Sequence, residues 1–140
     1  MGSYEVLEHT ADLSLTIHGT TLEDLFATAA RAMFECLVDI GSISASVEMD
    51  IHVVNGDEGV EELLVEWLRE LLYRLATDEM LFCRFDIGRL SDREVVARCA
   101  GELVDPERHR LRTEIKSVTY HDLEVRQEPR GWVAHVLFDI

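Results

Sequence analysis

The sequence has few cysteines, and they lie far apart. Cys36, Cys83 and Cys99 form no CxxC pair and no cysteine–histidine cluster. Since a zinc site or a disulfide framework requires such spacing, we expect neither, and we expect reduced thiols. The sequence also lacks a run of about eighteen apolar residues and a basic segment followed by an apolar leader. These absences predict a cytoplasmic protein that does not contact membranes.

Basic residues are scarce as well. The 140 residues include 28 acidic and 13 basic side chains, which gives a formal net charge of -15. Because this field repels phosphate backbones and anionic lipid head groups, we expect no direct tight binding of nucleic acid. Cations, or a basic surface on a protein partner, are favoured instead. The acidity could also serve only to keep the protein in solution.

Proline and glycine are rare, at 2 and 8 residues, and apolar residues make up 47% of the chain. A chain of this length and composition can bury a substantial core. The sequence shows no internal repeat, low-complexity tract or linker. We therefore expect one domain over residues 1–140.

Apolar residues spaced by three and four predict two helices. The first set runs from Leu22 to Leu37 and follows Thr20 and Thr21, which can cap a helix. The second set runs from Leu63 to Leu75, after a turn-forming stretch at residues 55–57. Each set forms a broad apolar stripe, so both helices should cover an apolar sheet.

Alternation with period two predicts strands elsewhere, and Gly101 and Gly131 are expected in turns. The predicted strands are Leu13–Ile17, Val47–Val53, Leu81–Asp86, Glu94–Ala100, Ser117–Arg126 and Trp132–Phe138. Residues 127–131 should join the last two strands as a hairpin, and the C-terminal half should form an antiparallel meander. The predicted fold class is α+β, with two helices packed on a mainly antiparallel β-sheet sandwich.

Three stretches carry more polar chemistry than such strands require: residues 8–12, 105–109 and 115–121. Each also has an ordinary explanation. Asp105 and Pro106 can start a turn, and Lys116 can be a solvated charge on an edge strand. The pattern alone leaves both interpretations open.

The last two residues suggest a metal site. Asp139 and the α-carboxylate of Ile140 are neighbours, and Asp12 would join them if the first strand lies beside the last. A ligand set made only of oxygen favours calcium or magnesium over zinc or copper. The alternative is that the terminus is frayed and solvated.

Motifs of self-sufficient enzymes are missing. The 6 histidines show no HExxH or Ser-His-Asp spacing, and no P-loop, GxGxxG or GxSxG motif occurs. A metal-dependent phosphoesterase that uses the carboxylates stays open as an alternative. His9, His109 and His121 could serve such a site, although their positions in space cannot be read from the sequence.

Several segments together resemble the archease family. They are YEVLEHTADLSL near the start, TLEDLFATAARAMFE and LLVEWLRELLY in the predicted helices, IKSVTYHDLEV, and the closing WVAHVLFDI. The similarity runs from Tyr4 to Ile140. It implies a fold similar to the core of a redox-regulated heat-shock chaperone, in agreement with the predicted sandwich.

The resemblance also implies a function. Archeases are accessory proteins, not enzymes, and they promote guanylylation and multiple turnover of the GTP-dependent tRNA-splicing RNA ligase. By the same resemblance Asp12, Asp139 and the main chain of Ile140 match a divalent-metal site, usually calcium. Lys116, with His121 and His9, would contribute to activation of the ligase. The alternative is a broader chaperone for RNA-modifying enzymes, such as a tRNA methyltransferase.

Overall fold

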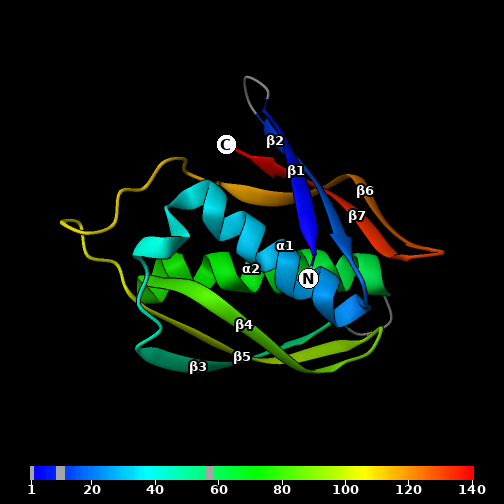
Figure 1. Cartoon of the computed structure of the whole chain (residues 1–140), viewed down its shortest axis with the longest axis horizontal. Helices are drawn as coiled ribbons and strands as arrows, with labels where there is room; N and C mark the ends of the chain where they lie inside the picture. The colour runs from blue at the N-terminus through cyan, green and yellow to red at the C-terminus, as the bar shows by residue number, and fades with distance from the viewer. Residues whose placement is uncertain (1, 9–11, 56–58) are drawn as a thin grey trace.

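The computed structural model describes residues 2–8, 12–55 and 59–140. Two helices lie between two antiparallel sheets (Figure 1), which confirms the predicted α+β class. In chain order the elements are β1 (Ser3–Glu8), β2 (Asp12–Gly19), α1 (Leu22–Leu37), a 3-10 turn (Ile40–Ser42), β3 (Val47–Val54), α2 (Val60–Asp78), β4 (Met80–Leu90), β5 (Glu94–Leu103), β6 (Ser117–Glu128) and β7 (Gly131–Asp139).

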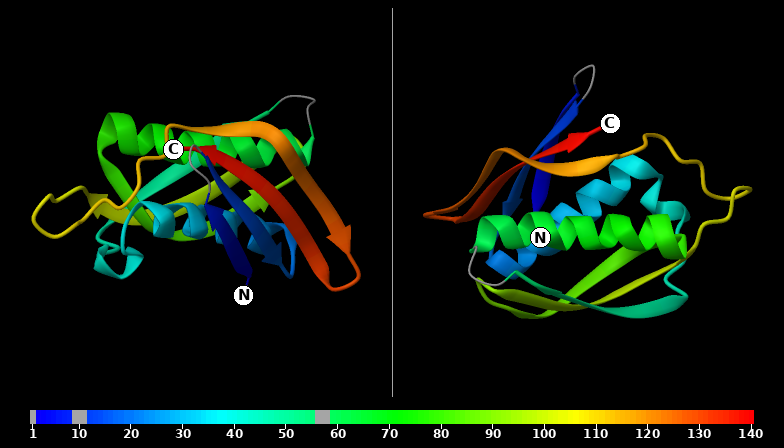
Figure 2. Two further views of the ribbon diagram at one scale, coloured as in Figure 1. Left: turned by 90° about the horizontal axis from the view of Figure 1, so that it is seen from above. Right: turned by 180° about the vertical axis from the view of Figure 1, so that it is seen from behind.

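The first sheet has 4 strands in the order β1-β2-β7-β6. Its central pair, β2 and β7, joins the start of the chain to its end, and Figure 2 shows the C-terminus beside the beginning of β2. Buried residues of β2 and β7, such as Leu15 and Phe138, alternate with more exposed ones. The buried face packs on the helices, and the opposite face carries polar residues such as Ser14, Thr16 and Asp139.

The second sheet has 3 strands in the order β3-β5-β4 and covers the other side of the helices. The predicted single meander in the C-terminal half is therefore wrong, because β4 and β5 pair in one sheet while β6 and β7 pair in the other. The prediction that Gly101 occupies a turn is also wrong. Gly101 lies inside β5, opposite Phe82, and a Cβ atom there would come within 1.8 Å of the Leu81 carbonyl oxygen.

Both helices are held by local and by core contacts. Thr21 caps α1, since its hydroxyl accepts a 3.0 Å hydrogen bond from the Asp24 amide, and the Asp24 carboxylate accepts from the Thr20 amide at 2.8 Å. In α2, Trp67 is fully buried, as its helical spacing predicts. Neither of these helices is long and apolar enough to cross a bilayer, and no other described helix is.

One strand was not predicted. β1 pairs with β2 at the edge of the first sheet, but Glu5, Val6 and Leu7 are all exposed in succession. An edge strand with this exposure shows no alternation of apolar and polar residues, and the period-two signal is therefore absent.

Candidate metal and partner site at the strand ends

Three strands of the first sheet end in one row of residues. Asp12 at the start of β2 lies opposite Asp139 at the end of β7, and Asp139 lies opposite Ser117 at the start of β6. Residues directly opposite one another in a sheet point to the same face, with Cβ atoms about 5 Å apart. The neighbouring row is buried against the helices, so this row points to the opposite face.

The hydrogen bonds of this row leave one acceptor without a donor. Asp139 accepts a 2.7 Å hydrogen bond from the Ser117 hydroxyl through Oδ2. Asp12 Oδ1 is buried and has no hydrogen-bond partner among the described residues. Two carboxylates facing each other across a strand pair repel, and a buried acceptor without a donor is costly. A cation between Asp12 and Asp139 would offset both costs.

The donor chemistry of the row fits a hard divalent cation. Carboxylate and main-chain oxygens are the ligands that calcium and magnesium prefer. Within the described residues no group of three or more His, Cys, Asp or Glu side chains could hold a metal ion. A site here would therefore combine the two carboxylates with main-chain oxygens. Ile140, which is partly buried against the core, can supply a main-chain oxygen.

The backbone of Lys116 adjoins this row of strand-end residues. Its backbone amide donates a 2.8 Å hydrogen bond to the Asp139 carbonyl oxygen, and its side chain is exposed. It is the single lysine of the chain. The structure thus brings together Asp12, Asp139, Ile140 and Lys116 from both halves of the sequence.

Comparison with known proteins gives the family. The model of the Archease protein family matches residues 4–140. The chain belongs to the archease family. It is 40% identical over 141 residues to protein archease of Methanosarcina mazei, with 98% of this chain and 95% of that protein covered. It is 37% identical over 144 residues to protein archease of Pyrococcus furiosus, with both chains covered in full.

A solved structure agrees with this assignment. The solution structure of protein 1598 from Methanobacterium thermoautotrophicum is similar to this chain with a TM-score of 0.79 and 32% sequence identity, and 98% of each chain is covered. The resemblance to the archease family that the sequence motifs indicate is thereby confirmed.

Of the histidines singled out from the sequence, His121 lies in a strand bulge and His109 in a turn. His121 lies outside the carboxylate row, in a bulge where β6 leaves its register with β7 between Thr119 and Glu124. It is exposed, and its Nε2 lies 3.3 Å from the carboxylate of Asp122, which adopts a left-handed conformation with φ 55°. His9 lies outside the described residues.

His109 has a structural role. The side chain is fully buried, and its Nδ1 accepts a 2.8 Å hydrogen bond from the Asp105 amide. Its Nε2 lies 3.0 Å from Glu102 Oε2, so the ring is held as the Nε2–H tautomer. Asp105 also accepts from the backbone amides of Arg108 and His109, which confirms a turn starting at Asp105.

Sequence reasoning missed Ser117 as part of the site. A serine beside a lysine at the start of a strand is common, and only the register shows that it lies opposite Asp139. The predicted hairpin did not supply this signal, because a bulge between Thr119 and Glu124 shifts the register of β6 against β7 before it reaches Ser117.

Proposed function

We propose that this protein is an accessory activator of the GTP-dependent tRNA-splicing RNA ligase. In this role it promotes attachment of GMP to the ligase and has no catalytic activity of its own. The proposal rests on membership of the archease family and on the convergence of Asp12 and Asp139 from opposite ends of the chain. We place this activity in the cytoplasm.

The strand-end row would hold a divalent cation, which we propose to be calcium. Asp12 and Asp139 would supply carboxylate oxygens and Ile140 a main-chain oxygen. Bound there, the cation would supply positive charge that offsets charge developing on phosphate oxygens during nucleotidyl transfer. The Ser117 hydroxyl holds Asp139 in place by its hydrogen bond, and only one carboxylate oxygen of that residue is therefore left without a side-chain donor.

Lys116 would contact the partner. Its amide is fixed to the end of β7, and its side chain is exposed. An ammonium in this position can bind a phosphate of the bound nucleotide or a carboxylate of the ligase. The charge of -15 would speed encounter with the basic surface that an RNA-binding enzyme presents.

A guanylylation assay with the ligase from the same organism tests this proposal. Asp12→Ala and Asp139→Ala should each reduce the rate to that of the ligase alone, and chelation of divalent ions should do the same to the wild type. Asp86→Ala is the matched control, because Asp86 is an exposed carboxylate of the other sheet, paired with Arg84. Full activation by the Asp12 and Asp139 variants would exclude the metal site from the mechanism.

A second candidate function is chaperoning of RNA-modifying enzymes more broadly, such as a tRNA methyltransferase. The exposed apolar side chains of Val6 and Leu7 on edge strand β1 favour it, since a chaperone binds through such surface. This activity would survive Asp12→Ala and Asp139→Ala. If the Asp12→Ala and Asp139→Ala variants still protect a methyltransferase from aggregation, the chaperone function is supported.

A further inference from the structure

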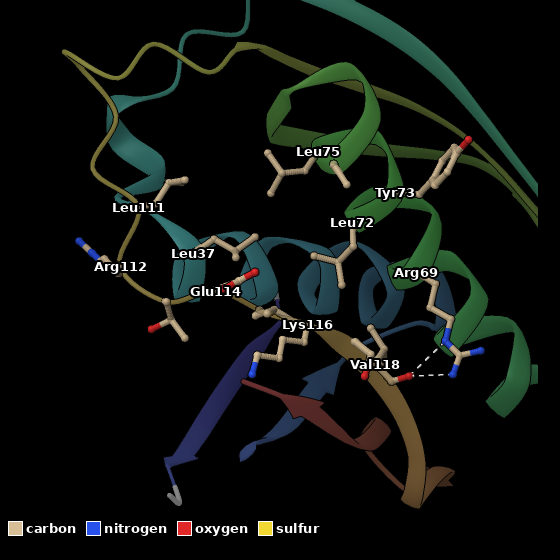
Figure 3. A pocket seen from close by; sticks show the side chains of 14 residues that line it. Leu37, Arg69, Leu72, Tyr73, Leu75, Leu111, Arg112, Glu114, Lys116 and Val118 are labelled. Carbon is tan, nitrogen blue, oxygen red and sulfur yellow. Dashed lines mark hydrogen bonds between the residues drawn. The ribbon is translucent and has the colours of Figure 1, made fainter. Parts of the chain in front are cut away.

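A half-open apolar groove lies next to Lys116. It has a volume of about 800 Å³ and runs between the C-terminal half of α2, the end of α1 and the segment 111–118 (Figure 3). The apolar residues of its lining include Leu37, Leu72, Leu75, Ala76, Ile115 and Val118. Tyr73 and Leu111, which are 59% and 56% exposed, continue the apolar surface at its rim. Apolar side chains that adjoin one another at the surface can mark an interaction site.

One wall of the groove is a stretch of extended chain with unused hydrogen-bonding groups. The stretch is fixed at both ends, because the Arg112 amide donates to the Leu37 carbonyl oxygen at 2.7 Å and the Lys116 amide donates to Asp139. Between them, the amides of residues 113–115 donate to no acceptor in the described part of the chain. Free backbone groups on an extended segment can pair with an added strand.

A side chain of the protein covers the backbone edge at Val118, but none of the described side chains hydrogen-bonds to the amides of residues 113–115. The guanidinium of Arg69, from α2, donates two hydrogen bonds of 3.1 and 2.8 Å to the Val118 carbonyl oxygen (Figure 3). Arg69 also lies 4.6 Å from the centre of the Tyr120 ring and is held by it. The edge at Val118 is therefore closed by the protein itself, whereas residues 113–115 stay open.

Two of the charged side chains of the groove lack partners among the described residues. Glu114 and Lys116 both line it, and neither side chain forms an ion pair or hydrogen bond with any described residue. Arg112 points away from the apolar lining in Figure 3 and donates to the Glu35 carbonyl oxygen at 3.3 Å. In a chain with a net charge of -15, a carboxylate at an apolar groove favours a basic residue of an occupant.

We propose that this groove binds an extended segment of the ligase partner. The segment would pair with the backbone of residues 113–115, insert one bulky apolar side chain between Leu72, Leu75 and Leu111, and place a basic side chain against Glu114. This inference rests on the proposed function. Because Lys116 belongs both to the groove and to the strand-end site, a segment bound here would hold that site against the ligase.

The affinity of the purified full chain for the cognate ligase tests the groove. Ala76→Arg fills it with a long side chain, and Ala76 is an exposed position of α2 at which arginine suits a helix. We expect this substitution to raise Kd at least about tenfold, as the loss of an anchor side chain does. Half-maximal guanylylation should then need a higher concentration of the variant than of the wild type, in proportion to the raised Kd.

Thr77→Arg is the matched control. It adds the same charge at the neighbouring exposed position, which does not line the groove. We expect wild-type affinity from it. An equal loss of affinity in both variants would assign the effect to charge alone and overturn the proposal.

A second variant and a second readout keep the test independent of folding. Leu111→Ser removes an exposed apolar side chain of the rim and should also weaken binding. Synthetic peptides that tile the ligase sequence should include one that binds the wild type and fails to bind Ala76→Arg. Wild-type affinity of Ala76→Arg and Leu111→Ser would overturn the groove while leaving the proposed function intact.

Two further outcomes are decisive. Absence of any complex between the wild type and the ligase would overturn the proposed function together with this inference. Binding of an apolar dye in the groove, with an undiminished affinity of Ala76→Arg for the ligase, would make the groove a small-molecule pocket and overturn the proposal.

Discussion

The indole Nε1 of Trp67 in α2 donates a 3.0 Å hydrogen bond to the backbone carbonyl of Phe26 in α1, and both residues are fully buried. This bond ties the two helices together in the middle of the sandwich. Trp67→Phe removes the donor and leaves a cavity, so we expect the free energy of unfolding to fall by about 2–3 kcal/mol. Urea denaturation measures this change in the free energy of unfolding. Trp132→Phe is the control, and its effect should be smaller because Trp132 is only partly buried.

Calcium should stabilise the protein through the strand-end row. At a concentration about 100 times Kd, binding raises the free energy of unfolding by about 2.7 kcal/mol, or the melting temperature by about 5–10 °C. Asp12→Asn and Asp139→Asn should abolish the shift. Without calcium, Asp139→Asn should be at least as stable as the wild type, because it removes one of two opposed charges. A lower melting temperature of that variant without calcium would contradict the predicted repulsion.

Acid should weaken the turn that carries His109. A hydrogen bond from Arg108 and one from the Ser44 amide lower the pKa of Glu102 from its ordinary value of 4.5 to about 2. Because the folded-state pKa is the lower one, Glu102 contributes its full stability above about pH 4.5, and this contribution is lost as the pH falls toward 2. Hence the stability difference between wild type and Glu102→Gln should shrink over that range.

Arg108→Gln provides the control for this pH dependence. It removes the largest cause of the lowered pKa of Glu102, so the contribution of Glu102 should disappear at a higher pH than in the wild type. The prediction would be contradicted if the difference in unfolding free energy between wild type and Glu102→Gln stayed constant from about pH 5 to pH 2.

Gly101 should not tolerate a side chain. An added Cβ atom would overlap the Leu81 carbonyl oxygen of the paired strand, and we expect Gly101→Ala to cost about 3 kcal/mol of unfolding free energy. Gly88→Ala is the matched control in β4, because its Cβ atom would lie 3.5 Å from the Val96 carbonyl oxygen, an ordinary contact. Equal stability of the two variants would show that the strands can separate at little cost.

Most helices and strands could be predicted from the sequence, because their apolar residues recur with a clear period. Both helices and the strands from β2 to β7 have apolar residues at regular spacing, and Thr21 and Gly131 mark their boundaries. The partition into two sheets could not be predicted, since period-two alternation says which face of a strand is buried but not which strand it pairs with. Gly101 was misassigned for a related reason, because a tight approach of two strands leaves no local signal.

The candidate site was partly predictable. Asp12 and Asp139 could be paired in advance only on the assumption that the first and last strands are neighbours, and the register of β2 with β7 fulfils it. The contribution of Ser117 depends on the register of β6, and the groove at residues 113–115 depends on how an extended segment without periodicity crosses two helix ends. Such information resides in tertiary contacts, and local patterns do not carry it.

The single lysine has a practical consequence for labelling. Apart from the α-amino group of the chain, Lys116 is the one primary amine to which an active ester can couple. Since it borders both the groove and the carboxylate row, a fluorophore attached there would sense occupation of either surface without any engineered cysteine.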